Sequence, residues 1–374
     1  MSNENDYSIF EMLKRYKDKD LMISIIKELR SISKSPINIM EVCGGQTFAL
    51  ARYGIEPLLP PTIKMIHGPG CPVCVTPTAI IDEAVILASM EDVIFCTFGD
   101  MMRVPGSNGS LLKARSEGAD VRMFYSPLDV IRVAKENPQK KIIFFAIGFE
   151  TTAPIYALML EEAVQEDIHN LYLLTSLFTV PAAIYALSAD NECNIDALLA
   201  AGHVCAITGT KEYEEISAKL NIPIVVTGFE PVDLLQGILM AVRQFEDGIH
   251  ILENAYPRVV SAQGNTKAQE LVDKYFTISD QLWRGLGVIP KSGLSLRQDY
   301  ELYDCRECFS LEIGNNVDSN SCISGEIMKG KALPKDCKWF GNKCTPLTPI
   351  GAPMVSSEGV CAAYHKYKIY GDES

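Results

Sequence analysis

The sequence predicts an α/β fold with two lobes, each a parallel sheet flanked by helices, plus a loop-rich domain that contains several cysteines. Short apolar runs rich in β-branched residues recur from about residue 37 onward, and helical stretches separate them, an alternation typical of parallel sheets. Runs such as Ile142–Ile147 are apolar throughout, as expected for strands buried on both faces. After about residue 290 the periodicity ends and Gly, Pro, Ser and Cys become frequent, which indicates a small domain held by a metal centre.

The elements are expected in the following order. Residues 6–35 place apolar side chains at helical spacing, which predicts one or two amphipathic helices. The predicted strands are apolar runs that end at Gly, Pro or Asp or at a polar turn: Ile37–Val42, Ile63–His67, Val93–Thr97, Val121–Tyr125, Ile142–Ile147, Leu171–Leu174, Val204–Thr208 and Ile224–Val226.

Two similar segments indicate how the lobes divide. Ala146–Thr151 and Val226–Pro231 each follow an apolar strand and share the run Gly-Phe-Glu. We interpret them as equivalent strand ends of two lobes, at residues 37–147 and 148–245, with residues 1–36 and 246–374 forming the helical and loop-rich domain. Coincidence between two strand ends is the alternative explanation.

Composition narrows the class of function. The 374 residues are 47% hydrophobic and 22% charged, so the chain can bury a sizeable core. Its formal net charge of −13 argues against a general binder of nucleic acid or of anionic membranes. No apolar run approaches the ~20 residues that cross a bilayer. Residues 1–16 are polar, without the apolar core of a signal peptide, so we expect a cytoplasmic protein.

The twelve cysteines are the unusual part of this composition. In the cytoplasm thiols stay reduced and structural disulfides are rare. The cysteines therefore point to metal or redox chemistry.

Cys43 occupies a position that favours an ionised thiol. It follows the first predicted strand, and Gly44 and Gly45 lead from it into a helical stretch. Glycines let the backbone approach a ligand closely, and a helix N-terminus lowers the pKa of a nearby thiol. The alternative is a small core residue beside a glycine turn.

Cys71 and Cys74 form a CxxC pair in a second strand-to-helix connection. The loop Gly68–Gly70 precedes them, and Thr76 is the expected N-cap of a helix that begins at Pro77. This spacing suits a reversible dithiol–disulfide pair or two ligands of a soft metal. Half of a structural zinc site is the alternative, although no second pair follows nearby.

Two carboxylates follow other predicted strands. Asp100 and Glu150 lie where open α/β sheets bind their ligands, beyond the carboxyl ends of the strands. They could accept hydrogen bonds or handle protons near the thiols, or they could be solvated loop residues. A phosphate-binding loop is excluded as a rival explanation, because neither GxGxxG nor GxxxxGK[ST] occurs around Gly68–Gly70.

Four further cysteines lie in the loop-rich C-terminal part, separated by fourteen, six and sixteen residues: Cys322, Cys337, Cys344 and Cys361. Four thiolates on irregular chain are the usual ligands of a 4Fe–4S cluster, and a zinc site with four cysteine ligands is the alternative. A nearby second CxxC pair, Cys305 and Cys308, could supply ligands instead or lie at the surface. The remaining cysteines, Cys96, Cys193 and Cys205, are in or beside apolar segments and are expected in the core.

Several long motifs together resemble the HypD family of hydrogenase maturation factors. They occur in order over essentially the whole chain: Met40–Gly45, Gly68–Cys74, Thr97–Ser107, Gly148–Thr152, Gly228–Pro231, Trp283–Gly287 and Met354–Cys361. The resemblance implies two α/β lobes and a cluster domain built from both termini. It also implies a scaffold on which the iron–dicyanide–carbonyl unit of NiFe hydrogenases, Fe(CN)2CO, is assembled, with no conventional small-molecule turnover evident.

The resemblance also assigns roles to residues and implies partners. Cys43 matches the family cysteine that shares iron with a small chaperone, HypC, and a second partner, HypE, delivers the cyanide. Cys71 and Cys74 match the redox-active dithiol, and the 4Fe–4S ligands map onto Cys322, Cys337, Cys344 and Cys361. The chain departs from the family pattern at Gln46 and Leu177, where histidines are usual, and at Ser324, where many members have a cysteine. Glutamine cannot carry a proton near pH 7 as histidine can.

The combined hypothesis is a scaffold in which electrons pass from the cluster to Cys71 and Cys74, while Cys43 holds iron. Thiolates suit low-valent iron because both are soft. Two alternatives remain open: a thiol–disulfide oxidoreductase that uses the cluster as its electron source, and an interaction module with structural zinc.

Overall fold

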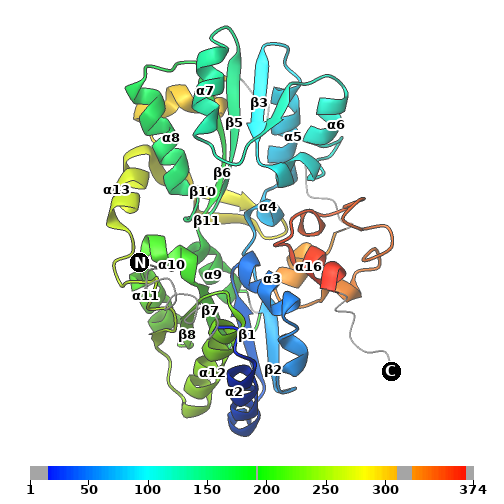
Figure 1. The fold of residues 1–374 in the computed structure, drawn as a ribbon, viewed down its shortest axis with the longest axis vertical. Coiled ribbons are helices and arrows are strands. Elements are labelled where there is room, and N and C mark those ends of the chain that lie inside the picture. Colours follow the sequence, from blue (N-terminus) through cyan, green and yellow to red (C-terminus); the bar gives the residue numbers. More distant parts are fainter. Residues whose placement is uncertain (1–15, 191–192, 310–321, 368–374) are drawn as a thin grey trace, which may run out of the picture.

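Two β-sheets lie one above the other along the long axis of the molecule, as the computed structural model shows for residues 16–190, 193–309 and 322–367 (Figure 1). Sheet A lies in the lower half of the view and sheet B in the upper half. The C-terminal segment, coloured orange to red, lies beside the junction of the two sheets. The predicted α/β class is confirmed.

Sheet A contains five parallel strands in the order β2-β1-β7-β8-β9. Their bounds are β1 Ile37–Glu41, β2 Ile63–His67, β7 Ala197–Ala201, β8 Ile224–Thr227 and β9 Leu252–Asn254. At the carboxyl edge Glu41 of β1 pairs with His67 of β2, so the loops that follow these two strands start side by side.

Sheet B contains six strands in the order β10-β11-β6-β5-β3-β4. The strands β3 to β6 pair in parallel, whereas β11 runs antiparallel to both β6 and β10. The sequence did not indicate this terminal hairpin. The bounds are β3 Val93–Thr97, β4 Val121–Met123, β5 Lys141–Gly148, β6 Leu171–Phe178, β10 Phe276–Trp283 and β11 Gly287–Leu296.

The chain visits each sheet twice. It builds β1 and β2 in sheet A, passes to sheet B for β3 to β6, returns to sheet A for β7 to β9, and ends sheet B with β10 and β11. Each sheet therefore takes strands from both sides of the boundary placed at residue 147 from the sequence. The shared Gly-Phe-Glu run lies at the ends of β5 in sheet B and β8 in sheet A. Strands that are neighbours in space need not be consecutive in the chain.

One predicted strand is wrong, and the error affects the site. Val204–Thr208 is part of a helix, α10 (Gly202–Thr208), and the strand of this region is β7 (Ala197–Ala201). The run Ala197–Ala201 has low β-propensity, whereas Val204–Thr208 is rich in β-branched residues. Burial decides the outcome, because β7 is fully buried between β1 and β8.

Helices cover both faces of the sheets, and β5 shows how. Ile143 and Phe145 pack on one face with α5, while Ile142 and Phe144 pack on the other with α7 and α8. This confirms the expectation from the unbroken apolar run. The main helices are α2 Lys19–Ile32, α3 Gly44–Arg52, α5 Thr78–Ala88, α6 Leu111–Ser116, α7 Asp129–Glu136, α8 Ala153–Gln165, α9 Val180–Ser188, α11 Lys211–Leu220, α12 Pro231–Asp247 and α13 Thr266–Tyr275. The beginning of the predicted helical region 6–35 lies outside the described residues.

The C-terminal segment packs against α3, the short helix α4 (Pro72–Val75) and strand β2 (Figure 1). It consists mainly of turns and short helices, namely α15 Ser324–Met328, η4 Pro334–Asp336, η5 Ala352–Met354 and α16 Val360–Tyr367. This agrees with the loop-rich domain expected here. Within the described part of the chain, no helix is both long enough and apolar enough to span a membrane.

Candidate functional site

Cys43 lies at the turn between β1 and α3, where it is the N-cap of the helix. Its sulfur accepts a hydrogen bond from the amide of Gly45 at 3.3 Å, and its own amide donates to Oε2 of Glu41 at 2.9 Å. The side chain is almost completely buried. The predicted strand–glycine–helix geometry is therefore confirmed.

The CxxC loop lies directly against this turn. Cys71 is the N-cap of α4 (Pro72–Val75), Cys74 lies inside that short helix, and the two sulfurs form a disulfide. The longer helix that follows, α5, starts at Thr78, with Pro77 rather than Thr76 as its N-cap. The amide of Gly44 donates to the carbonyl of Gly70 at 2.9 Å. The structure thus brings the three predicted thiols into one region.

Gly70 makes this close approach possible. A Cβ atom at Gly70 would overlap the backbone of Val42 and Cys43, so any larger residue would separate the CxxC loop from the Cys43 turn. The two loops enclose a cavity of about 20 Å³ whose walls also include Ser324, Met328, Pro353 and Val360 from the C-terminal segment.

A loop before α16 closes the site from the other side. The backbone and Cβ of Glu358 lie directly over Gly44. Burial raises the pKa of Glu358, and the charge of Asp100 raises it further. Asp100 belongs to the short helix η2 (Gly99–Arg103). The structure therefore places Asp100 within electrostatic range of Glu358, and it is Glu358 that lies over the Cys43 turn.

Glu150 lies elsewhere. It follows β5, and its Oε1 accepts a hydrogen bond from the amide of Val180 at 2.7 Å. It lines a separate cavity of about 270 Å³, together with Thr179 and Glu212. Burial raises the pKa of Glu150 to about 8, and Glu212 contributes in the same direction. Glu150 and the CxxC pair thus line different cavities.

The ionisation state of Cys43 differs from the expectation. Burial raises the pKa of its thiol well above the ordinary value, and the charges of Glu41 and Glu358 raise it further. Hydrogen bonds from the amides of Gln46 and Gly45 act in the opposite direction but are weaker. The helix N-terminus alone therefore does not make Cys43 a thiolate, because burial beside two carboxylates outweighs it. A positive charge beside the sulfur would favour loss of the thiol proton.

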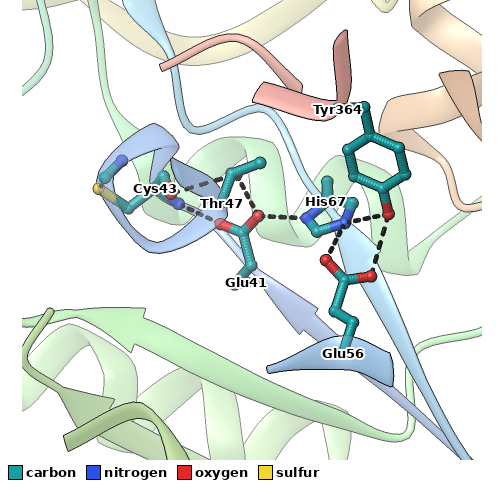
Figure 2. Close-up of polar contacts among 7 residues, drawn as sticks. Glu41, Cys43, Thr47, Glu56, His67 and Tyr364 are labelled. Atoms are coloured by element: carbon teal, nitrogen blue, oxygen red, sulfur yellow. Dashed lines mark hydrogen bonds and ion pairs between the residues drawn. The ribbon is translucent and has the colours of Figure 1, made fainter. Parts of the chain in front are cut away.

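A buried ion-pair network connects this turn to the C-terminal helix, as Figure 2 shows. Nδ1 of His67 lies 2.8 Å from Oε1 of Glu41, and Nε2 lies 3.3 Å from Oε1 of Glu56 and 3.1 Å from the hydroxyl of Tyr364. Glu41 also accepts hydrogen bonds from the Thr47 hydroxyl and the Cys43 amide. Tyr364 lies on α16, three residues after Cys361.

The protonation states in the network follow from these contacts. Burial alone would lower the pKa of His67, but Glu56, Tyr364 and Glu41 outweigh it and raise the pKa well above the ordinary value. Burial alone would raise the pKa of Glu56, but the charge and hydrogen bond of His67, with the hydrogen bond of Tyr364, lower it. His67 is thus an imidazolium between two carboxylates. The sequence contained His67 only as the last residue of a strand, and no motif pointed to this role.

His203 is the second residue that sequence reasoning missed. It follows β7 at the start of α10, and its two ring nitrogens lie 3.7 and 3.8 Å from the sulfur of Cys43. The misplaced strand hid this signal, because a strand at Val204–Thr208 puts His203 before the strand rather than after its carboxyl end.

Three of the four C-terminal cysteines lie within electrostatic range of the fourth, Cys361. Burial raises the pKa of Cys361 well above the ordinary value, and Cys322, Cys344 and Cys337 each raise it further. The amide of Ile350 donates a hydrogen bond to the sulfur of Cys344 at 3.3 Å. Among the described residues, no group of three or more His, Cys, Asp or Glu side chains is arranged to hold a metal ion. The residue types, four cysteines of which three influence the fourth electrostatically, are nevertheless those that hold an iron–sulfur cluster.

The other cysteines lie apart from these centres. Cys96, Cys193 and Cys205 are buried, as predicted. Cys305 and Cys308 lie on the short helix α14 (Cys305–Cys308), where Cys305 is buried and Cys308 is exposed. The electrostatic influences on Cys361 come from Cys322, Cys344 and Cys337 and not from this pair.

Comparison with known proteins gives the family. Residues 19–368 match the sequence model of HypD, described as "Hydrogenase formation hypA family". The chain is 45% identical over 367 residues to Hydrogenase maturation factor HypD2 of Bradyrhizobium diazoefficiens, covering 96% of this chain and 97% of that protein. It is 44% identical over 367 residues to Hydrogenase maturation factor HypD of Escherichia coli, covering 96% and 98%. The chain therefore belongs to the HypD family of hydrogenase maturation factors.

Proposed function

We propose that this protein is the scaffold on which the Fe(CN)2CO unit of a NiFe hydrogenase is assembled in the cytoplasm, with Cys43 as its iron-binding thiol. The observation that carries the proposal is the meeting of Cys43 and the CxxC loop, fixed by the hydrogen bond from Gly44 to Gly70. A thiol for iron and a dithiol for electrons thus lie at one sheet edge. The HypD family membership supports the same interpretation.

Cys43 binds the iron cargo as a thiolate. Its buried thiol keeps its proton until a cation arrives, and binding then forms the iron–sulfur bond while the proton leaves to water. A HypC-like chaperone supplies a further thiolate, and HypE delivers the cyanide. Soft thiolate ligands suit low-valent iron.

Cys71 and Cys74 exchange two electrons and two protons as they cycle between disulfide and dithiol. Cys322, Cys337, Cys344 and Cys361 would hold a 4Fe–4S cluster, which supplies one-electron chemistry when bound. The walls of the cavity beside the dithiol include Val360, the neighbour of Cys361 in the chain. This short connection supports electron transfer from the cluster site to the dithiol.

The test is anaerobic co-purification with the chaperone. Wild-type protein is expected to retain the chaperone and iron beyond that of the cluster, whereas Cys43→Ala loses this additional iron. The matched control is Cys96→Ala, which removes another buried cysteine, on β3 in sheet B rather than at the carboxyl edge of sheet A. A Cys43→Ala protein that keeps both the chaperone and the additional iron contradicts the assignment of Cys43.

The Cys71–Cys74 disulfide favours a second candidate, a thiol–disulfide oxidoreductase with the cluster as electron source. It predicts turnover of a protein disulfide without iron beyond the cluster. Unchanged turnover in Cys43→Ala, together with its loss in Cys71→Ser, would support this candidate over the scaffold.

A cluster is recognised by broad absorption near ~400 nm. Zinc without that absorption would instead indicate a structural zinc site with four cysteine ligands.

A further inference from the structure

The C-terminal segment is basic, although the chain as a whole is acidic. Residues 322–367 contain six lysines against three Asp and Glu, whereas the whole chain contains 34 Lys and Arg against 47 Asp and Glu. Two of the six lysines form ion pairs, Lys329 with Asp190 at 2.8 Å and Lys331 with Glu326 at 3.7 Å. The other four are exposed and form no ion pair with any residue that the structure describes: Lys335, Lys338, Lys343 and Lys366.

Two of the unpaired lysines lie on the turn that joins Cys337 to Cys344. The amide of Cys344 donates a hydrogen bond to the carbonyl of Trp339 at 2.8 Å, which closes the turn. The ammonium nitrogens of Lys338 and Lys343 lie 4.9 and 4.5 Å from the centroid of the Trp339 ring. A single indole ring therefore holds both cations by cation–π contacts, directly between two of the cysteines assigned to the cluster.

Neighbouring residues extend this positive charge. Lys335 is on η4, three residues before Lys338. The one carboxylate between Lys335 and Lys343 in the sequence is Asp336, whose Oδ2 accepts a hydrogen bond from the amide of Leu333 at 2.8 Å. We call Lys335, Lys338 and Lys343, with the turn 337–344, the lysine surface.

The lysine surface fits an acidic protein. Charges of opposite sign steer two proteins together and fix their orientation, whereas the net charge of −13 repels an acidic partner from the rest of the chain. Leu347, three residues after Cys344, is 91% exposed. It offers an apolar contact beside the charged rim, as protein interfaces commonly do.

The position of the lysine surface indicates that such a partner brings electrons. Reduction of the Cys71–Cys74 disulfide takes two electrons, which must come from outside the chain. Cys337 is partly exposed at the base of the turn, so a partner docked here comes close to the cysteines assigned to the cluster. Val360, next to Cys361 in the chain, lines the cavity beside Cys71.

We propose that the lysine surface is the docking site for an acidic protein that carries one electron at a time. In each cycle two carrier molecules lose one electron each, the S–S bond between Cys71 and Cys74 breaks, and each sulfur takes up one proton from water. The inference rests on the proposed function, because it presumes that the four C-terminal cysteines hold a cluster. It adds the class of protein that supplies the electrons and the surface that receives it.

The test measures binding and electron transfer separately, on the full-length protein purified anaerobically with its cluster. The probes are two acidic carriers, a plant-type [2Fe–2S] ferredoxin and a flavodoxin. The oxidised carriers are titrated calorimetrically to obtain Kd, and the reduced carriers are mixed rapidly to follow bleaching of the cluster absorption. Both measurements are made at ionic strengths of about 0.01 M and about 0.15 M, between which the Debye length falls from about 30 to about 8 Å.

Four proteins are compared. They are the wild type, a charge-reversed variant with Lys338→Glu and Lys343→Glu, a neutral variant with Lys338→Gln and Lys343→Gln, and a control with Lys211→Glu and Lys267→Glu. Lys211 and Lys267 are exposed residues of α11 and α13, on the opposite side of the view from the C-terminal segment (Figure 1). The control therefore makes the same change in net charge as the charge-reversed variant, at a distant surface.

The charge-reversed variant is expected to bind at least one of the two carriers at least ~10-fold more weakly than the wild type at low ionic strength, and to be reduced at least ~10-fold more slowly. The neutral variant is expected to show a loss of at least ~3-fold, and it decides the test if the charge-reversed variant does not fold. The control should change by less than ~3-fold, and all differences should shrink at the higher ionic strength.

The possible failures are distinguishable. A protein that contains zinc and no cluster absorption contradicts the proposed cluster, and with it this inference. A cluster-loaded protein that binds neither carrier, or binds both equally well in the charge-reversed variant and the control, overturns the docking site and leaves the cluster and Cys43 unaffected. A single-stranded oligonucleotide that binds the lysine surface as tightly as the carriers would show a general polyanion site and would also overturn the inference.

Discussion

Replacing His67 by leucine should strongly destabilise the protein, because it leaves buried carboxylates without their cation. Glu41 is fully buried and, among the residues that the structure describes, would keep only the hydrogen bonds from Thr47 and the Cys43 amide. Removing one partner of a buried ion pair costs about 3–5 kcal/mol. Glu56 is partly exposed and keeps the hydroxyl of Tyr364, so we expect a loss of about 3 kcal/mol, at the lower end of that range.

The unfolding free energy lost in His67→Leu should depend on pH, and the two pKa shifts fix the direction of that dependence. The pKa of His67 is raised in the folded protein, so its contribution is fully present below the unfolded value of about 6.5 and disappears as pH rises through the raised pKa. The pKa of Glu56 is lowered, so its contribution is present above the unfolded value of about 4.3 and disappears as pH falls through the lowered pKa. The difference between wild type and variant is therefore largest between about pH 4.3 and 6.5.

The assay is equilibrium urea unfolding followed by tryptophan fluorescence, since Trp283 is fully buried. His169→Leu is the matched control, because a surface substitution changes stability by less than about 0.5 kcal/mol. The assignment of a buried imidazolium would be refuted if the unfolding free energies of wild type and His67→Leu differed by less than about 1 kcal/mol at about pH 5.5. It would also be refuted if this difference in unfolding free energy grew steadily toward high pH.

Three other substitutions test separate parts of the structure. Gly70→Ala should cost about 3 kcal/mol or more in urea unfolding and abolish iron capture by Cys43, because its Cβ would overlap the backbone of Cys43; retention of both properties would contradict the contact. For Glu150, whose pKa is raised to about 8, stability relative to Glu150→Gln should decrease as pH rises from about 4.3 to 8, and a pH-independent difference would contradict the shift. Cys308→Ser, at an exposed site, should change the unfolding free energy by less than about 0.5 kcal/mol and leave the cluster absorption unchanged, and loss of that absorption would make Cys308 a ligand.

The local sequence pattern was enough to predict those strands that are both apolar in composition and buried in the structure. The unbroken apolar run Ile142–Ile147 forms a central strand, and the Gly-rich turns after β1 and β2 place Cys43 and Cys71 together. The same reasoning failed at β7, where an alanine-rich run becomes a strand only because two neighbouring strands bury it. Its neighbour His203 was missed for this reason.

The protonation states of the site residues depend on the tertiary structure even more strongly than the strands do. The position of Cys43 at a helix N-terminus predicted a thiolate, yet burial reverses the effect, with the charges of Glu41 nearby and of Glu358 far away in the sequence acting in the same direction. The imidazolium state of His67 likewise needs Glu56 and Tyr364, from distant parts of the chain. Such pairings carry no local sequence signal.

The most direct test of the central claim is infrared spectroscopy of the protein after anaerobic co-expression with its chaperone and the other maturation proteins. If the Fe(CN)2CO unit is assembled on Cys43, the purified wild type shows cyanide and carbonyl stretching bands, and Cys43→Ala shows neither. Bands that persist unchanged in Cys43→Ala, with the chaperone still bound, would contradict the claim.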